Sequence, residues 1–169
     1  AWAQNRAGKK GLCKVVGNLP YNISSPLLFH LVSAANSIDE QVFMLQAEVV
    51  ERMVAKAGSS DFSRLSVMLQ ARYDMELVLE VPPEAFDPQP KVNSAVVRMI
   101  PRRDFALSDA QWSALEKVVA AAFSQRRKML RTNLSAFADR LKLTEVELKA
   151  RAQDISVDRY IEWAKVLAS

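Results

Sequence analysis

The chain has 169 residues, of which 50% are apolar and 25% are charged, a globular balance that excludes an intrinsically disordered protein. No stretch reaches the roughly 18–20 uncharged apolar residues that a membrane-spanning helix needs. The single cysteine, Cys13, excludes an internal disulfide framework. Together with the lack of an apolar signal segment in residues 1–11, it predicts a cytoplasmic protein.

The net charge of +4 is unevenly distributed. Residues 1–100 hold ten Lys and Arg against ten Asp and Glu, whereas residues 101–169 hold thirteen against nine. Such a basic C-terminal part favours an anionic partner, most often a nucleic acid, although a solvated basic face would have the same composition.

The first hundred residues alternate between strand and helix patterns. Apolar, β-branched runs predict strands at 12–16, 41–46, 76–81 and 95–100. Helical spacing predicts helices over 24–32, 48–56 and 63–73, with Ser24 or Ser25 as the first N-cap and Gly58 closing the second helix. This alternation predicts an α/β fold, a sheet with helices on its faces.

Residues 101–104 have the pattern of a linker, and every periodic segment after it is helical. Helices are predicted at 111–123, 125–141, 144–152 and 157–168, the first of them capped by Ser108. The sequence therefore predicts two domains, residues 1–101 and residues 105–169.

The segment Asn18-Leu19-Pro20-Tyr21 follows the first predicted strand directly. In an open α/β sheet, loops beyond the carboxyl ends of strands form the ligand crevice. An asparagine oxygen and a backbone carbonyl can both accept hydrogen bonds from an exocyclic amine, and an aromatic ring can stack on the base that carries it. The alternative is an ordinary turn, with the asparagine capping the backbone and the tyrosine packing on a helix.

Two more segments carry candidate binding residues. Phe86 lies among prolines in the loop 82–93, where a stiff backbone keeps its ring from collapsing inward. Arg126, Arg127, Lys128 and Arg131 place four cations within six residues, and on a helix Arg127 and Arg131 would share a phosphate-binding face. A solvated helix face is the alternative for these cations.

Several stretches together resemble the ribosomal RNA adenine N6,N6-dimethyltransferases (the KsgA type): NLPYNISSPLLFHL from Asn18, FMLQAEVV from Phe43, VPPEAFDPQPKVNSAVV from Val81, SQRRKMLR from Ser124 and ISVDRY from Ile155. The resemblance covers nearly the whole chain. It implies the C-terminal half of a Rossmann-like class I methyltransferase sheet at 1–101 and a small all-α RNA-binding domain at 105–169.

Carried over to these positions, the resemblance implies a catalytic set of Asn18, Leu19, Pro20, Tyr21 and Phe86. Asn18 and the Leu19 carbonyl would hold the adenine amine, Tyr21 and Phe86 would stack on the base, and Asn18 would also contact the cofactor. Arg126, Arg127, Lys128 and Arg131 would bind RNA.

The implied reaction is S-adenosylmethionine-dependent dimethylation at N6 of two adjacent adenosines in the 3′-terminal region of small-subunit (16S) ribosomal RNA, with a role in ribosome biogenesis. The implied partners are the small ribosomal subunit and its RNA. No metal ion and no membrane are expected, and the protein is expected to be a monomer. The four glycines of the chain form no Gly-rich cofactor turn. Most of the S-adenosylmethionine site is therefore expected outside this chain, which by itself would be inactive.

Three alternatives remain open. A related enzyme could modify large-subunit RNA, although the stretches NISSPLLF and QRRKMLR favour the small-subunit type. A DNA adenine methyltransferase shares the amine-binding logic, but Leu19 stands where those enzymes more often have proline. A non-catalytic RNA-binding or subunit-assembly factor could use the same surface, because fold similarity does not fix activity.

Overall fold

The computed structural model describes residues 13–20, 22–104 and 107–169. These form two compact units. The sheet unit comprises the described residues up to Val54 together with Arg72–Arg103. The helical unit comprises Ala55–Ala71 together with the described residues of Asp104–Ser169. Residues 55–71, which the sequence places in the first domain, thus lie in the helical unit, and the later boundary lies between Arg103 and Asp104.

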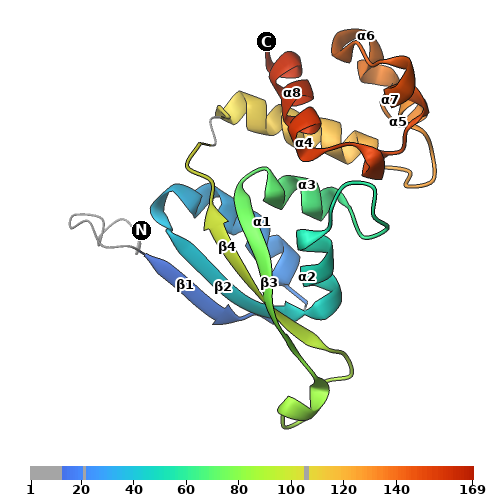
Figure 1. Cartoon of the computed structure of the whole chain (residues 1–169). Helices are drawn as coiled ribbons and strands as arrows, with labels where there is room; N and C mark the ends of the chain where they lie inside the picture. The colour runs from blue at the N-terminus through green and yellow to red at the C-terminus, as the bar shows by residue number, and fades with distance from the viewer. Residues whose placement is uncertain (1–12, 21, 105–106) are drawn as a thin grey trace. The chain divides into compact units, whose positions relative to one another are not determined.

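The sheet unit is built on four strands in the order β1-β2-β4-β3 (Figure 1). They are β1 (Lys14–Asn18), β2 (Glu40–Gln46), β3 (Tyr73–Val81) and β4 (Ser94–Pro101). Strand β1 runs parallel to β2, and β4 runs antiparallel to both of its neighbours. The predicted α/β class is therefore confirmed, with each of the four predicted strands present and no end shifted by more than three residues.

One face of the sheet carries its apolar core. Phe43 and Leu45 on β2 and Val97 and Met99 on β4 are buried on this face, as the two-residue period of a strand requires. Helices α1 (Ser24–Ala34) and α2 (Ala47–Val54) lie behind the sheet in the view of Figure 1 and contribute buried apolar side chains, Leu28 from α1 and Val50 and Met53 from α2. The Tyr73 hydroxyl joins α1 to this face by donating to the Leu31 carbonyl, 3.1 Å away.

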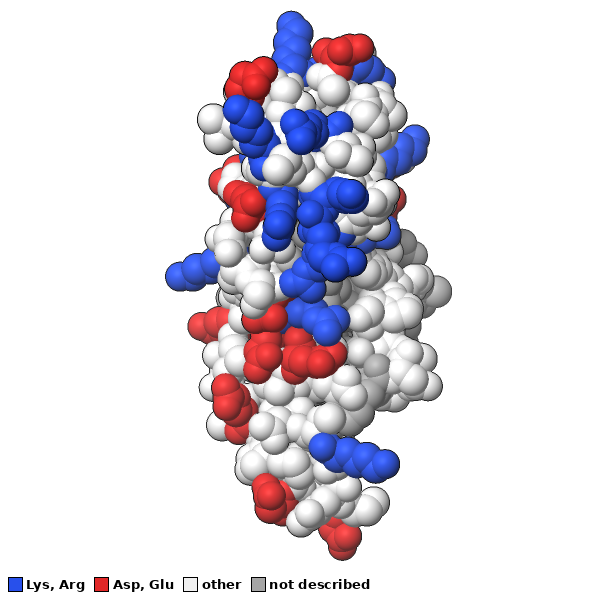
Figure 2. Space-filling model, turned by 90° about the vertical axis from the view of Figure 1, so that its right-hand side faces the viewer, with Lys and Arg blue, Asp and Glu red and all other residues white. Residues whose placement is uncertain are grey.

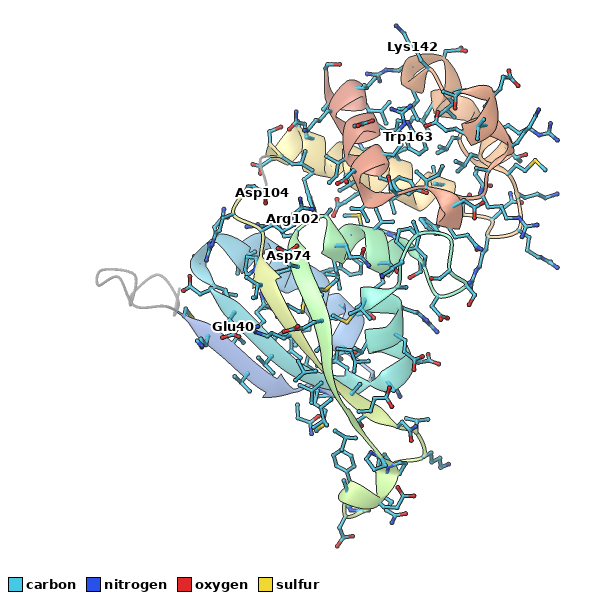
Figure 3. The ribbon with its side chains drawn as sticks, viewed as in Figure 1. Glu40, Asp74, Arg102, Asp104, Lys142 and Trp163 are labelled. Carbon is cyan, nitrogen blue, oxygen red and sulfur yellow. The ribbon has the colours of Figure 1, made fainter. Side chains whose placement is uncertain are left out.

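The opposite face carries a row of charges that crosses all four strands. Glu40, labelled in Figure 3, accepts from Lys14 at 2.6 Å and from Arg98 at 2.5 Å, and Arg98 also reaches Glu76 at 3.1 Å. The Lys14 ammonium and then the Arg98 guanidinium, both hydrogen-bonded to Glu40, lower the pKa of its carboxyl group.

The helical unit packs around α4 (Asp109–Ala122) and α8 (Val157–Ala168). Leu115, Val118 and Val119 on α4 are fully buried, as is Trp163 on α8, which Figure 3 labels. Shorter elements complete the unit: α3 (Arg64–Gln70), α5 (Leu130–Asn133), α6 (Ala138–Leu141) and α7 (Glu145–Lys149), with 3-10 turns at Ser135–Phe137 and Ala152–Asp154. Helix α8 has the bounds that the sequence predicts, and Ser108 caps α4 as predicted.

Aromatic contacts explain why residues 55–71 belong to the helical unit. Phe62 is buried and its ring lies 6.4 Å from that of Phe123, which in turn stacks on Tyr160 at 6.0 Å. Gly58, with φ +90°, donates its N–H to the Gln153 carbonyl at 2.7 Å. Local periodicity carries no information about such partners, so the sequence could not assign this segment.

Three local predictions are wrong. Helix α1 begins at Ser24 itself with Ile23 as its N-cap, so neither Ser24 nor Ser25 is the cap. Helix α2 ends at Val54, so Gly58 lies in a later turn rather than closing the helix. The predicted helix 125–141 is interrupted: residues 124–129 form a turn, followed by α5, a 3-10 turn and α6.

Candidate functional site

The sheet unit has a cleft of about 320 Å³ at the carboxyl end of β1. Among the described residues, those that line it come from two segments: Asn18, Leu19, Pro20, Phe86, Pro88 and Pro90. The first three directly follow or end β1, and the others belong to the loop between β3 and β4. Two segments far apart in the sequence therefore meet here.

The β1 side of the cleft is held in place by main-chain hydrogen bonds. Leu19 donates its N–H to the Met44 carbonyl on β2, 3.1 Å away, and its side chain is only 8% exposed. The N–H of Ile23 donates to the Pro20 carbonyl at 3.2 Å, which closes a turn over the loop. Because the Leu19 side chain is anchored inward and its N–H is occupied, its carbonyl is held in a fixed direction.

The acceptor groups of this segment are available to a ligand. Asn18 is exposed, and neither its side chain nor the Leu19 carbonyl forms a hydrogen bond with another described residue. An amide oxygen and a main-chain carbonyl on adjacent residues are two acceptors that one amino group can use together. Asn18 and the Leu19 carbonyl are therefore two adjacent free acceptors, and their binding of an amine stays a prediction.

The opposite wall carries the aromatic ring. Pro83–Ala85 forms a 3-10 turn, in which Ala85 and Phe86 donate to the carbonyls of Pro82 and Pro83 at 3.1 Å each. The Asp87-Pro88 peptide bond is cis. Phe86 is half-buried, so part of its ring faces the cleft rather than the core.

The structure thus brings Asn18, Leu19, Pro20 and Phe86 together, as the sequence predicts, whereas Tyr21 lies outside the described residues. The sequence names Pro88 and Pro90 only as stiffening neighbours of Phe86, and they are lining residues as well. None of the six lining residues carries an acid or base that titrates near neutral pH. What this cleft supplies is therefore placement and hydrogen-bond acceptors.

The basic cluster, defined as Arg126, Arg127, Lys128 and Arg131, lies in the helical unit but not on one helix. The first three occupy the turn 124–129, and Arg131 lies in α5, so the predicted helical face shared by Arg127 and Arg131 is wrong. All four are exposed, and none forms an ion pair with a carboxylate of a described residue. Figure 2 shows lysines and arginines gathered on one face of this unit.

Two contacts explain the turn. The Asn133 side-chain amide donates to the Ala122 carbonyl at 2.6 Å and to the Gln125 carbonyl at 3.0 Å, so it terminates α4 and closes the turn. The Leu130 N–H donates to the Ala150 carbonyl at 2.8 Å, which ties the far end of the turn to the residue after α7. The sequence does not signal this role of Asn133, because the two carbonyls lie eight and eleven residues before it, beyond the range of a local cap.

The described residues contain neither a metal-binding group nor a membrane-spanning helix. Within residues 13–20, 22–104 and 107–169, no three His, Cys, Asp or Glu side chains are grouped so as to hold a metal ion. None of the helices in this described part combines the length and apolar composition that crossing a membrane requires.

Comparisons with known proteins agree on one family. The family model described as ribosomal RNA adenine dimethylase matches residues 3–169. A protein of Burkholderia lata named ribosomal RNA small subunit methyltransferase A is 55% identical over 164 residues, 96% of this chain and 60% of the relative. Its namesake in Burkholderia mallei is 54% identical over 166 residues, 97% of this chain and 60% of the relative.

Solved structures agree on the fold. A dimethyladenosine transferase from Plasmodium falciparum superimposes with a TM-score of 0.77 at 23% identity, covering 92% of this chain and 66% of the other. A 23S rRNA methyltransferase, ErmE, gives a TM-score of 0.64 at 22% identity, covering 95% of this chain and 67% of the other. The chain thus shares its fold, a mixed four-stranded sheet with helices and a further helical unit, with these solved structures.

The chain spans about 60% of the length of the curated relatives it matches, while the family match extends over nearly all of its own residues. This chain therefore belongs to the ribosomal RNA adenine dimethylase family.

Proposed function

We propose that the complete protein transfers two methyl groups to N6 of each of two adjacent adenosines near the 3′ end of small-subunit ribosomal RNA. The observation that carries this proposal is the convergence of Asn18, Leu19 and Phe86 on one cleft. A volume of about 320 Å³ lies at the lower end of the roughly 300–1,000 Å³ of small-molecule sites, a size suited to one extruded base.

The Asn18 side-chain oxygen and the Leu19 carbonyl each accept a hydrogen bond from one N–H of the adenine amine. Two acceptors in that arrangement orient the amine and turn its nitrogen lone pair out of the ring system, where it can attack an electrophilic carbon. Phe86 stacks on the base and keeps it in the cleft, a contact worth about 1–3 kcal/mol per base. Positioning supplies the catalysis, since the lining residues offer no acid or base that titrates near neutral pH.

S-adenosylmethionine fits this site as the methyl donor, supplying a methyl carbon activated by its sulfonium group. We assign Asn18 a contact with this donor. Asn18 ends β1 at the carboxyl edge of the sheet, where open α/β sheets bind their ligands. Among the described residues, Gly17 and Gly58 are separated by forty positions, so the Gly-rich part of a donor site is expected from another part of the complete polypeptide.

The RNA partner is inferred from the relatives and from charge. Relatives 54–55% identical carry a name that specifies the small subunit, which favours that subunit over the large one. The basic cluster supplies exposed cations for phosphates, which fix a protein on RNA without reading its sequence. Specificity then comes from the shape of the folded small subunit, bound by a monomer in the cytoplasm during ribosome assembly.

Two substitutions at one position test this proposal. Asn18→Ala removes the side-chain acceptor and is expected to abolish methyl transfer by the complete protein while leaving small-subunit affinity nearly unchanged. Asn18→Asp keeps an acceptor oxygen and is expected to retain measurable transfer. Full transfer by Asn18→Ala would disprove the assigned role. Unmeasurable S-adenosylmethionine binding by the parent protein, with RNA binding intact, would favour a non-catalytic assembly factor.

A further inference from the structure

A second hollow, of about 590 Å³, lies in the sheet unit and shares a loop with the cleft. Seven residues line it: Gln46, Ala47, Glu48, Glu51, Lys91, Val92 and Asn93. Pro88 and Pro90 line the cleft, and the next residues of the same loop line the second hollow. The opposite walls come from the ends of β1 and β2, which are adjacent parallel strands, so both sites lie at the same edge of the sheet.

The second hollow is preformed by main-chain pairing. The N–H of Ala47, at the start of α2, donates to the Asn93 carbonyl at 2.9 Å. Next to this bond, Gln46, the last residue of β2, pairs with the fully buried Ser94, the first residue of β4, in the antiparallel register of the two strands. The loop is therefore fixed to the helix exactly where the two walls meet, and a ligand would find the site without ordering it first.

The polar groups of the hollow are free to bind. The side chains of Gln46, Lys91 and Asn93 form no hydrogen bond with another described residue. Of the two acidic residues, Glu48 is paired with Arg52 at 2.9 Å, whereas Glu51 is exposed and forms no ion pair with any described cation. The site therefore offers two amides, one unpaired carboxylate and, on the loop side, one cation.

Resting on the proposed function, we infer that this hollow binds the nucleotide adjoining the target adenosine in the single-stranded RNA. Glu51 accepts a hydrogen bond from the exocyclic amine of that base, and Gln46 and Asn93 meet its remaining polar edge. Lys91 neutralises the phosphate of the same nucleotide on the loop side. The Glu51 carboxylate repels phosphate, so the base faces α2 and the RNA backbone faces the loop.

This arrangement makes the neighbouring base a determinant of affinity. Adenine carries the amine that Glu51 requires, whereas an unsubstituted purine has the same stacking surface without it. A hydrogen bond to a charged acceptor changes affinity by about tenfold or more. The hollow would then favour a neighbouring base that carries an exocyclic amine over one that lacks it, while the target adenosine occupies the cleft.

The test measures RNA affinity of the complete protein, which does not depend on catalysis. Short single-stranded RNAs carry the target adenosine with either adenosine or unsubstituted purine riboside beside it, on each side in turn. The parent protein is expected to bind the adenosine form about tenfold more tightly on one side. Glu51→Ala should bring this ratio close to one. The matched control, Glu145→Ala at an exposed carboxylate of α7, should leave it unchanged. Lys91→Ala should weaken both RNAs alike.

The outcomes separate the two proposals. The second nucleotide site would be overturned if Glu51→Ala and Glu145→Ala gave the same ratio of affinities for the adenosine and purine riboside RNAs. It would also be overturned if the parent protein bound both RNAs equally. If the ratio behaves as expected but no RNA receives a methyl group, the site stands and the proposed methyl transfer fails.

Discussion

Asn18 and Phe86 line one cleft of the sheet unit, although β2 and β3 and the helices between them separate the two residues in the sequence. The cleft thus has an acceptor side chain on one wall and a half-buried aromatic ring on the other, the two groups that the proposed binding of a flat, amine-bearing base requires.

Phe86 is the residue that tests stacking apart from amine binding. Phe86→Ala is expected to raise KM for RNA and lower methyl transfer by about 5- to 100-fold, because base–aromatic stacking contributes roughly 1–3 kcal/mol. Phe86→Trp keeps a larger ring and should retain most activity. Steady-state kinetics on small subunits check this, and equal activity of the alanine and tryptophan variants would show that Phe86 does not stack on the base.

The basic cluster is expected to set the salt dependence of RNA binding. Replacing Arg126, Arg127 and Lys128 together by glutamine should flatten the slope of log affinity against log salt by about 2 to 3, since each phosphate contact contributes about 0.7 to 0.9. The matched control replaces Lys149, Lys165 and Arg140, which lie in other helices of the same unit. An unchanged slope in the first variant would place the RNA elsewhere.

Much of this account could be predicted from the sequence, because the informative signals are local. The strands of the sheet have continuous apolar runs, and α4 and α8 combine helical periodicity with serine caps at Ser108 and Ser156. On the β1 side of the cleft, Leu19 and Pro20 follow a strand end directly, where ligand loops are expected.

The rest depends on contacts between distant segments. Leu130, Leu134 and Leu141 are buried at a spacing that fits one helix, yet the Leu130 N–H bonds to Ala150 and the Asn133 amide holds the end of α4. Lys142, labelled in Figure 3, then ends α6 with a left-handed φ of 49°. Glycine or asparagine usually takes this conformation, so a lysine does not predict it. A periodic pattern cannot distinguish such an interrupted segment from a continuous helix.

Asn133 is therefore a test of how the basic turn is held. Asn133→Asp keeps the shape but loses both N–H donors, leaving the Ala122 and Gln125 carbonyls without this partner and facing a carboxylate. We expect about 1–3 kcal/mol of destabilisation in urea unfolding, together with weaker RNA binding. Thr132→Ala, at the exposed neighbouring position, should change neither property. Wild-type stability for Asn133→Asp would contradict the account of the turn.

Glu40 makes the stability of the sheet unit depend on pH. Its hydrogen bonds to Lys14 and then Arg98 lower the carboxyl pKa in the folded state, so the unfolded chain takes up the proton first as the pH falls. The stabilisation is complete above the ordinary carboxyl pKa and is lost as the pH falls through the lowered folded value. Urea midpoints between about pH 5 and pH 3 should therefore fall less steeply in Glu40→Gln.

The control for that measurement is Glu80→Gln, since Glu80 is exposed on β3 and forms no ion pair with a described residue. Its pH dependence should match that of the parent chain. If Glu40→Gln and Glu80→Gln behave alike, the row of charges across the sheet contributes nothing to the acid sensitivity.

Chemical analysis of the RNA product tests the proposed methyl transfer directly. The complete protein is incubated with S-adenosylmethionine and unmethylated ribosomal subunits, and the modified nucleosides are mapped by mass spectrometry of RNA fragments. The account predicts N6,N6-dimethyladenosine at two adjacent positions near the 3′ end of the small-subunit RNA, and none with Asn18→Ala. Dimethyladenosine in large-subunit RNA instead, or no methyl group in either RNA, would contradict it.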